Sequence, residues 1–157
     1  MNVRQWMQWL WAPPLSAPRA TILIRTMAGA VFLWEGVLKF VYVNQGVGRF
    51  TKLGMPLPEV LAPAIAVLEI VGGLCFILGV WTRYAALAGI PILLGAIFTV
   101  HGAAGFFFTN PKGGWEYPAF WTIALVAQAL LGDGAYALRP SRQNDAVGGL
   151  LSGAHSR

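Results

Sequence analysis

Charged residues are the scarcest class in this chain. Of its 157 residues, 57% are hydrophobic and only 11% are charged, whereas a soluble domain of this size carries about a quarter charged residues. This composition excludes an ordinary soluble domain and predicts a membrane protein. The lipid bilayer is therefore the first partner that we expect.

Cysteine and histidine are almost absent. Cys75 is the single cysteine, which excludes an internal disulfide and the thiol pair of a disulfide relay. We expect Cys75 to be buried as a small apolar residue. A bis-histidine haem needs two histidines at matching depth, but only His101 lies near an apolar run, since His155 lies in the tail. We expect neither a haem nor a metal site.

A basic stripe is also missing, although the formal charge is +5. The cations are spread over loops and tails, so we expect no nucleic acid partner, and we interpret them as topology signals. By the positive-inside rule, their distribution puts both termini in the cytoplasm. The cations on the cytoplasmic side are Arg4, Arg19, Arg83, Arg139 and Arg142, and those on the opposite side are Arg49, Lys52 and Lys112.

Long apolar runs, in contrast, are abundant. A helix needs about 20 apolar residues to cross a hydrocarbon core of roughly 30 Å, and four runs reach that length: 20–41, 59–80, 84–103 and 117–135. The connections are short or moderate and no internal repeat is present. We therefore predict an all-α integral membrane four-helix bundle that forms one domain, residues 19–138.

The two ends of the chain differ from this domain. In residues 1–18, Trp6, Trp9 and Leu10 fall at helical spacing, which favours a short helix in the headgroup zone. An irregular tail with chance tryptophans is the alternative, and Pro13 and Pro14 argue against a signal peptide. Residues 139–157 are polar and glycine-rich, and we expect a disordered cytoplasmic tail.

Proline and glycine mark the limits of the predicted spans. Pro58 and Glu59 suit the first turn of the second span. That span is expected to end at Gly79. Pro91 lies within the third span and predicts a kink there, because proline has no backbone donor.

Two opposite charges lie inside the first span. Glu35 and Lys39 are four residues apart with Glu first, the favourable order for an intrahelical pair, and Arg25 projects within about 80° of Glu35. A charge at the bilayer centre costs about 2.5–3.5 kcal/mol on insertion scales, so these side chains should face protein or a wet cavity. One face of the first helix is therefore predicted to be polar.

A third charge, Glu69, lies roughly 16 Å from the end of the second span. Gln128 in the fourth span lies at about the same predicted depth. Two interpretations are open: a hydrogen bond between these two residues that only locks helix packing, or a part for Glu69 in ligand or proton handling. On the second span, Glu69 lies in a stripe with Ala62, Ala66, Gly73 and Phe76, and this stripe lets another helix approach closely. On the fourth span, Gln128 shares a face with Tyr117, Trp121 and Ala124.

Polar residues are predicted to converge at the extracytoplasmic end of the bundle. They form a pocket that opens outward. Glu35 and Lys39 of the first helix form one wall, and Glu69 and Gln128 lie deeper as its floor. The candidate catalytic residues are Glu35, Lys39, Glu69 and His101, and the candidate ligand-binding residues are Asn110, Glu116, Tyr117 and Gln128.

Several motifs together resemble the DoxX family of small bacterial membrane proteins. They are Arg25, "GVLKF", "LGMPLP", "LEIVGGLCFILGVWTRYAAL", "VHGAAGFFFTN…GGWEYP" and "GDGAY", and they cover residues 20–137. This chain departs from the pattern at Glu35, where the family often has His, and at "ALRP", which replaces Ser-Leu-Asp. The first departure removes a histidine-based role at that position.

The resemblance implies a four-helix subunit of the bacterial inner membrane that is associated with a redox system, as in thiosulfate:quinone oxidoreductase. A quinone head group would then enter the pocket and accept a hydrogen bond from Lys39 or His101, with Glu35 or Glu69 as the proton carrier. Electrons would come from a partner redox subunit or from a small reductant. The alternatives are a non-catalytic assembly or anchoring subunit and a small transporter, and a homo-oligomer stays open.

Overall fold

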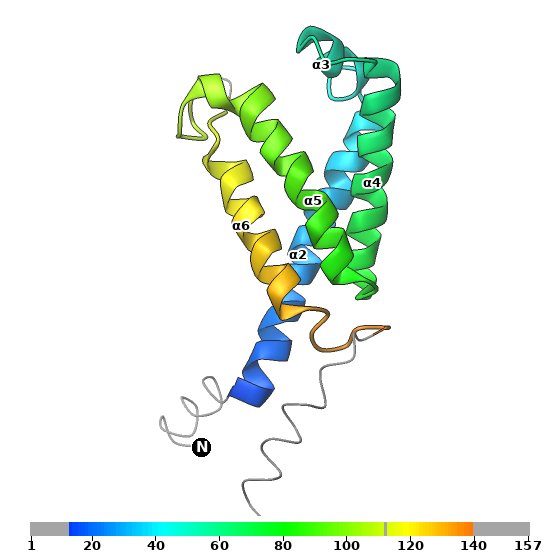
Figure 1. The fold of residues 1–157 in the computed structure, drawn as a ribbon, viewed down its shortest axis with the longest axis vertical. Helices are drawn as coiled ribbons and strands as arrows, with labels where there is room; N and C mark the ends of the chain where they lie inside the picture. The colour runs from blue at the N-terminus through cyan, green and yellow to red at the C-terminus, as the bar shows by residue number, and fades with distance from the viewer. Residues whose placement is uncertain (1–12, 112, 140–157) are drawn as a thin grey trace, which may run out of the picture.

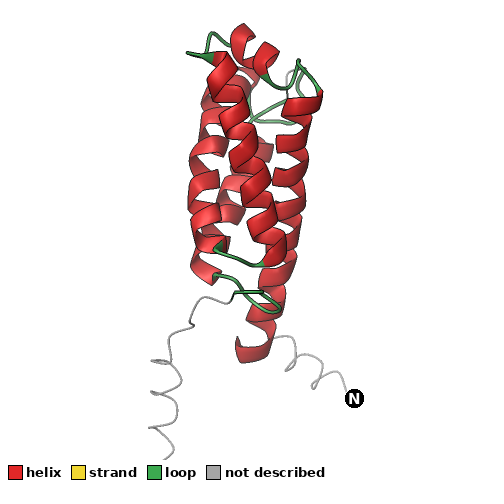
Figure 2. Ribbon diagram, turned by 90° about the vertical axis from the view of Figure 1, so that its right-hand side faces the viewer, coloured by secondary structure: helices red, strands yellow, loops and turns green. Residues whose placement is uncertain are grey.

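The computed structural model describes residues 13–111 and 113–139, and this part of the chain is helical, with no strand (Figures 1 and 2). The elements in order are α2 (Pro13–Val41), α3 (Val47–Lys52), α4 (Pro58–Leu78), α5 (Thr82–Ala96), the π-helical turn η1 (Ile97–His101), the 3-10 turn η2 (Gly102–Ala104) and α6 (Glu116–Leu131). The all-helical prediction is therefore confirmed.

Three helices of the described part are long and apolar enough to cross a membrane. They are Arg19–Val41, Pro58–Leu78 and Thr82–Ala104. They correspond to the first three predicted spans. The fourth long helix, α6, has 16 residues, a rise of about 24 Å, which is less than a hydrocarbon core of roughly 30 Å.

The predicted ends of the second span are confirmed. Pro58 occupies the first turn of α4, and Glu59 is the acidic residue of that turn. Gly79 ends the helix with a φ of +68°, a left-handed conformation that favours glycine because a Cβ atom is absent. Pro91 lies inside α5, which continues to Ala96 before the wider turn η1, and the kink at Pro91 stays a prediction.

The first helix begins earlier than the apolar run indicates. The predicted span starts at residue 20, but α2 starts at Pro13, so the boundary at residue 18 falls inside a continuous helix. The predicted interfacial helix around Trp6, Trp9 and Leu10 and the predicted tail from residue 140 onward lie outside the described residues.

The helices form two closely packed pairs, α2 with α4 and α5 with α6. At the first interface a Cβ atom on Gly73 would lie 2.7 Å from the backbone nitrogen of Leu33 and 2.8 Å from the carbonyl oxygen of Gly29, so only glycine permits this approach. The predicted stripe on α4 is confirmed, because its five residues are the buried residues of that helix: Ala62, Ala66, Glu69, Gly73 and Phe76.

The two pairs are joined by an apolar core and separate toward one end. Figure 1 shows them close together in the lower half and diverging toward the end that carries α3 and the α5–α6 loop. We call this the upper end, and we call the end with the α4–α5 corner and residues 132–139 the lower end. The core residues that join the pairs are Ala28, Phe32, Phe76, Ala86, Trp121 and Leu125.

Candidate functional site

Lys39 forms the central contact of the candidate site. Its ammonium group lies 2.7 Å from Glu69 Oε2 and donates a 2.9 Å hydrogen bond to Glu69 Oε1. Glu35, one turn earlier on α2, is more distant, with its Oε2 atom 3.8 Å from Lys39 Nζ. The structure thus joins three predicted residues, Glu35, Lys39 and Glu69, which we call the lysine triad.

Helix direction explains why Lys39 reaches Glu69. Side chains tilt toward the N-terminus of their own helix. The N-terminus of α2 is at the lower end and that of α4 is at the upper end. The side chain of Lys39 therefore leans down and that of Glu69 leans up, so that their charged groups meet between the helices.

The members of the lysine triad differ in exposure. The side chain of Glu69 is 8% exposed and that of Lys39 is 13% exposed, whereas that of Glu35 is 44% exposed. A buried charge is tolerated only when it is paired, and Lys39 supplies this pairing for Glu69. Glu35 is the member that can exchange protons or ligands with the surroundings. With all three groups ionised, the triad carries one excess negative charge.

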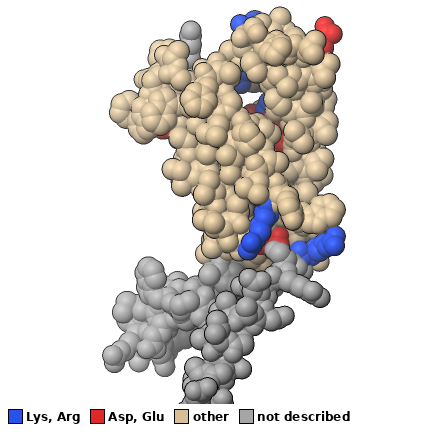
Figure 3. Space-filling model, viewed as in Figure 1, with Lys and Arg blue, Asp and Glu red and all other residues tan. Residues whose placement is uncertain are grey.

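The upper half of the molecule is hollowed beside these charges. Figure 3 shows a hollow between the diverging helices, with basic and acidic atoms in and beside it. Lys39 also lines a cavity of about 170 Å³ whose other walls are residues of the α2, α3 and α4 ends. These residues, apart from Lys39, are apolar: Phe40, Val43, Val47, Ala62 and Pro63.

Four further predicted site residues lie in or beside the α5–α6 loop: His101, Asn110, Glu116 and Tyr117. His101 Nδ1 lies 2.8 Å from the carbonyl oxygen of Gly113, so this nitrogen must carry the proton, because a carbonyl only accepts. Asn110 donates a 2.7 Å bond to the carbonyl of Ala104. These contacts fold the loop back onto the end of the π-helical turn.

Glu116 and Tyr117 begin α6 directly after this loop. Glu116 Oε1 accepts a 2.7 Å bond from the backbone nitrogen of Phe108. The ring of Tyr117 packs against the rings of Phe108 and Trp121, with centroids 5.6 and 6.3 Å apart. In the described part of the chain, the contacts of these four residues stay within the α5–α6 loop and the first part of α6, and none joins the lysine triad.

Gln128 is not the partner of Glu69. It is fully buried, and its amide donates instead to the carbonyl oxygen of Gly132. The predicted fourth span ran to residue 135, but α6 ends at Leu131. The predicted hydrogen bond between Gln128 and Glu69 is therefore wrong, because Glu69 is bonded to Lys39 instead.

A second polar group, not assigned from the sequence, lies at the lower end. Arg25 is only 1% exposed and donates a hydrogen bond to the carbonyl oxygen of Asp133. The carboxylate of Asp133 accepts two hydrogen bonds from Thr82. One comes from the hydroxyl group of Thr82, and the other, 3.2 Å long, comes from the backbone nitrogen of Thr82. We call Arg25, Thr82 and Asp133 the arginine cluster.

Arg25 was expected on the same helix face as Glu35, and ten residues of helix separate the two by about 15 Å. Asp133 had no expected partner. The signal that identifies it is an acidic residue directly after an apolar run, matched by a buried arginine at the start of the first span.

Comparisons with known proteins identify the family of the chain. The family model described as DoxX matches residues 20–102, more than half of the chain. The chain belongs to the DoxX family. In this DoxX protein, the matched segment runs from α2 to the turn after α5 and holds the whole lysine triad. Among the described residues, no group of three His, Cys, Asp or Glu side chains is placed to hold a metal ion.

Two curated relatives of this DoxX protein are similar over most of its length. It is 38% identical over 112 residues to "Uncharacterized membrane protein Rv3486" of Mycobacterium tuberculosis, covering 71% of this chain and 66% of the relative, just under two thirds. It is 31% identical over 120 residues to "Putative oxidoreductase CatD" of Bacillus subtilis, covering 76% of this chain and 84% of that protein. No solved structure matches the chain at a comparable level of significance.

Proposed function

We propose that this membrane protein is a small subunit of a redox system in the bacterial inner membrane and that a quinone head group binds beside the lysine triad. α6 makes a fourth crossing in this proposal, with both termini in the cytoplasm and the upper end facing outward. The observation that carries the proposal is the position of Lys39, a charged donor between two carboxylates at the edge of a cavity. The name of the Bacillus relative, "Putative oxidoreductase CatD", supports the same reaction class.

The cavity beside Lys39 has the chemistry that a quinone ring needs. Its walls are apolar apart from Lys39, and small-molecule sites combine apolar walls with a few polar groups that fix orientation. Its volume of about 170 Å³ suits a single ring, and lies below the 300–1,000 Å³ or so of sites for drug-sized ligands. Lys39 donates to a quinone oxygen, and Glu69 holds Lys39 in place.

Proton transfer falls to Glu35 in this proposal. Reduction of a quinone to a quinol takes up two electrons and two protons. Glu35 is the exposed carboxylate of the triad, so it can pass protons between water and the quinone oxygen. The electrons come from a partner redox subunit or from a small reductant such as thiosulfate.

The test is the reduction of a short-chain quinone by membranes that contain the protein and its reductant. Lys39→Ala removes a charged hydrogen-bond donor, a contact of about 1.5–3 kcal/mol, so the rate should fall by about 10- to 150-fold. Lys52→Ala changes an exposed lysine on α3 and is the matched control. A wild-type rate for Lys39→Ala in a folded protein would refute the proposal.

An assembly subunit without chemistry of its own is the second candidate. It is favoured by the Lys39–Glu69 pair, which joins α2 to α4 and therefore also serves packing. This candidate predicts that Glu69→Gln leaves the function of the complex intact and that gentle extraction recovers a partner in fixed ratio. A protein that is recovered alone would contradict it.

A further inference from the structure

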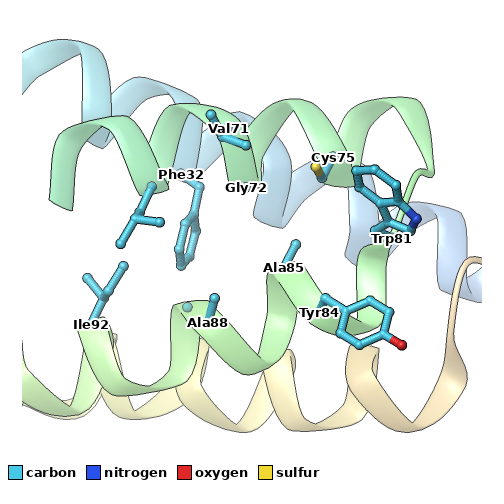
Figure 4. A pocket seen from close by; sticks show the side chains of 11 residues that line it. Phe32, Val71, Gly72, Cys75, Trp81, Tyr84, Ala85, Ala88 and Ile92 are labelled. Atoms are coloured by element: carbon cyan, nitrogen blue, oxygen red, sulfur yellow. The ribbon is translucent and has the colours of Figure 1, made fainter. Parts of the chain in front are cut away.

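A second cavity lies on the other face of α4, away from the lysine triad. It has a volume of about 170 Å³ and runs between α4 and α5, with Phe32 of α2 beneath it. Figure 4 shows Cys75 on one side of this groove and Ala85 and Ala88 on the other. Cys75 is therefore partly exposed, although the sequence predicted it to be buried.

The groove opens toward the surface that a bilayer covers. Leu68, Val71 and Ala88 line it and are exposed, on two helices that are apolar and long enough to cross a membrane. Hydrocarbon chains of lipids are the groups that such a surface meets. The groove is also too small for a bulky ligand, because sites for drug-sized molecules have about 300–1,000 Å³.

The lower end of the groove is amphipathic and basic. Trp81 and Tyr84 lie together at that end (Figure 4), and both residue types favour the headgroup level of a membrane. The guanidinium carbon of Arg139 lies 5.4 Å from the ring centroid of Trp81. Arg83 is exposed at the same corner, and the nearby Asp133 is buried and bonded to Thr82.

We propose that this groove binds one acyl chain of an anionic phospholipid, with the phosphate headgroup held by Arg83 and Arg139. Charge selects the headgroup, because the guanidinium group of Arg139 lies over Trp81 at the end of the groove, and Arg83 is exposed at the same corner, beside the turn that follows α6. Of the described carboxylates, Glu59 is exposed and Glu116 is partly exposed, and both lie at the other end of the bundle. Arginine also forms bidentate hydrogen bonds with phosphate oxygens. The volume of the groove, about 170 Å³, has room for a segment of one extended chain.

The test measures the lipids that stay bound to the full chain. The protein is placed in nanodiscs of equal amounts of phosphatidylcholine and phosphatidylglycerol, released into mild detergent and weighed by native mass spectrometry. We expect one phosphatidylglycerol per chain. Each of Arg83→Gln and Arg139→Gln should lower the preference for phosphatidylglycerol by about fivefold, the effect of roughly one surface contact. Lys52→Gln, at the upper end, should leave it unchanged.

A matched pair of glycine variants tests the groove itself. A Cβ atom on Gly72 has only Phe32 within 4 Å, at 4.0 Å, so Gly72→Leu fills the groove without a backbone clash. Gly95→Leu places the same side chain on α5 outside the groove, where a Cβ atom meets nothing within 4 Å. The first variant should lose the bound lipid and the second should keep it.

Cys75 provides a measurement that needs no variant. It is the single cysteine of the chain, so alkylation by an apolar maleimide reports on the groove. The reaction should be slower in nanodiscs that contain phosphatidylglycerol than in pure phosphatidylcholine. Equal alkylation rates, equal retention of the two lipids, or lipid retention by Gly72→Leu would overturn the proposal. Native mass spectra that show an isoprenoid quinone or a second copy of the chain bound instead of the phospholipid would also overturn it.

Discussion

The two ends of the bundle use charge in opposite ways. At the lower end, Arg25, Thr82 and Asp133 are buried, and their hydrogen bonds tie α2, the start of α5 and the segment after α6 together. At the upper end, Lys39 and Glu69 tie only α2 to α4, and Glu35 is 44% exposed. A buried polar cluster that is almost fully bonded fixes a structure, whereas a partly exposed one keeps groups available for a ligand. The lower end is therefore the structural end, and the upper end is the one suited to chemistry.

The largest expected effect of a single change is at the lower end. Arg25→Met removes a buried cation, so the carbonyl oxygen of Asp133 loses its donor and the buried carboxylate of Asp133 loses a neighbouring positive charge. Breaking a buried pair of charged groups costs about 3–5 kcal/mol. The free energy of unfolding, measured by denaturant titration in mixed micelles, should fall by that amount. Lys52→Met, which changes an exposed cation outside both charged groups, is the control. A stability loss below about 1 kcal/mol for Arg25→Met would remove the distinction between the ends.

A smaller loss is expected at the upper end. Lys39→Met strands the carboxylate of Glu69, but water reaches the site through the exposed side of the triad, so we expect about 2 kcal/mol, less than for a fully buried pair. The double variant Lys39→Met/Glu69→Met should regain most of this stability, because no uncompensated charge remains. Additive losses in the same unfolding assay would contradict the pairing of these two residues.

The smallest effect on stability is expected for Glu35→Gln. A half-exposed ion pair contributes about 0–1 kcal/mol, and the 3.8 Å separation from Lys39 is long, so the free energy of unfolding should change by less than about 0.5 kcal/mol. Quinone reduction should nevertheless fall, since a side-chain amide cannot take up and release a proton as a carboxylate does. A variant that is both stable and fully active would exclude Glu35 from proton transfer.

The parts of this fold that depend on local pattern could be predicted from the sequence. The stripe on α4 followed from the spacing of its small residues, and the end of that helix followed from Gly79. Both depend on the sequence of one helix, so no knowledge of neighbouring helices was needed.

The parts that depend on relative depth could not be predicted. Lys39 has a favourable partner at Glu35 by spacing, but its closer partner comes from another helix. Gln128 bonds to Gly132, directly after its own helix, and not to Glu69 on α4. Depth counted along each apolar run does not say which side chains of neighbouring helices meet. The contact between Arg25 and Asp133 spans 108 positions in the chain, and no local pattern reports it.

That separation along the chain has a consequence for biogenesis. Arg25 enters the bilayer with the first helix, whereas Asp133 is synthesised only after α6. Until then the buried guanidinium lacks the partner that it has in the finished protein, so the bundle closes at its lower end last. A ribosome-stalled intermediate that stops after α5 should therefore stay accessible to proteases or water-soluble labels near Arg25, and release of the last helix should abolish that access.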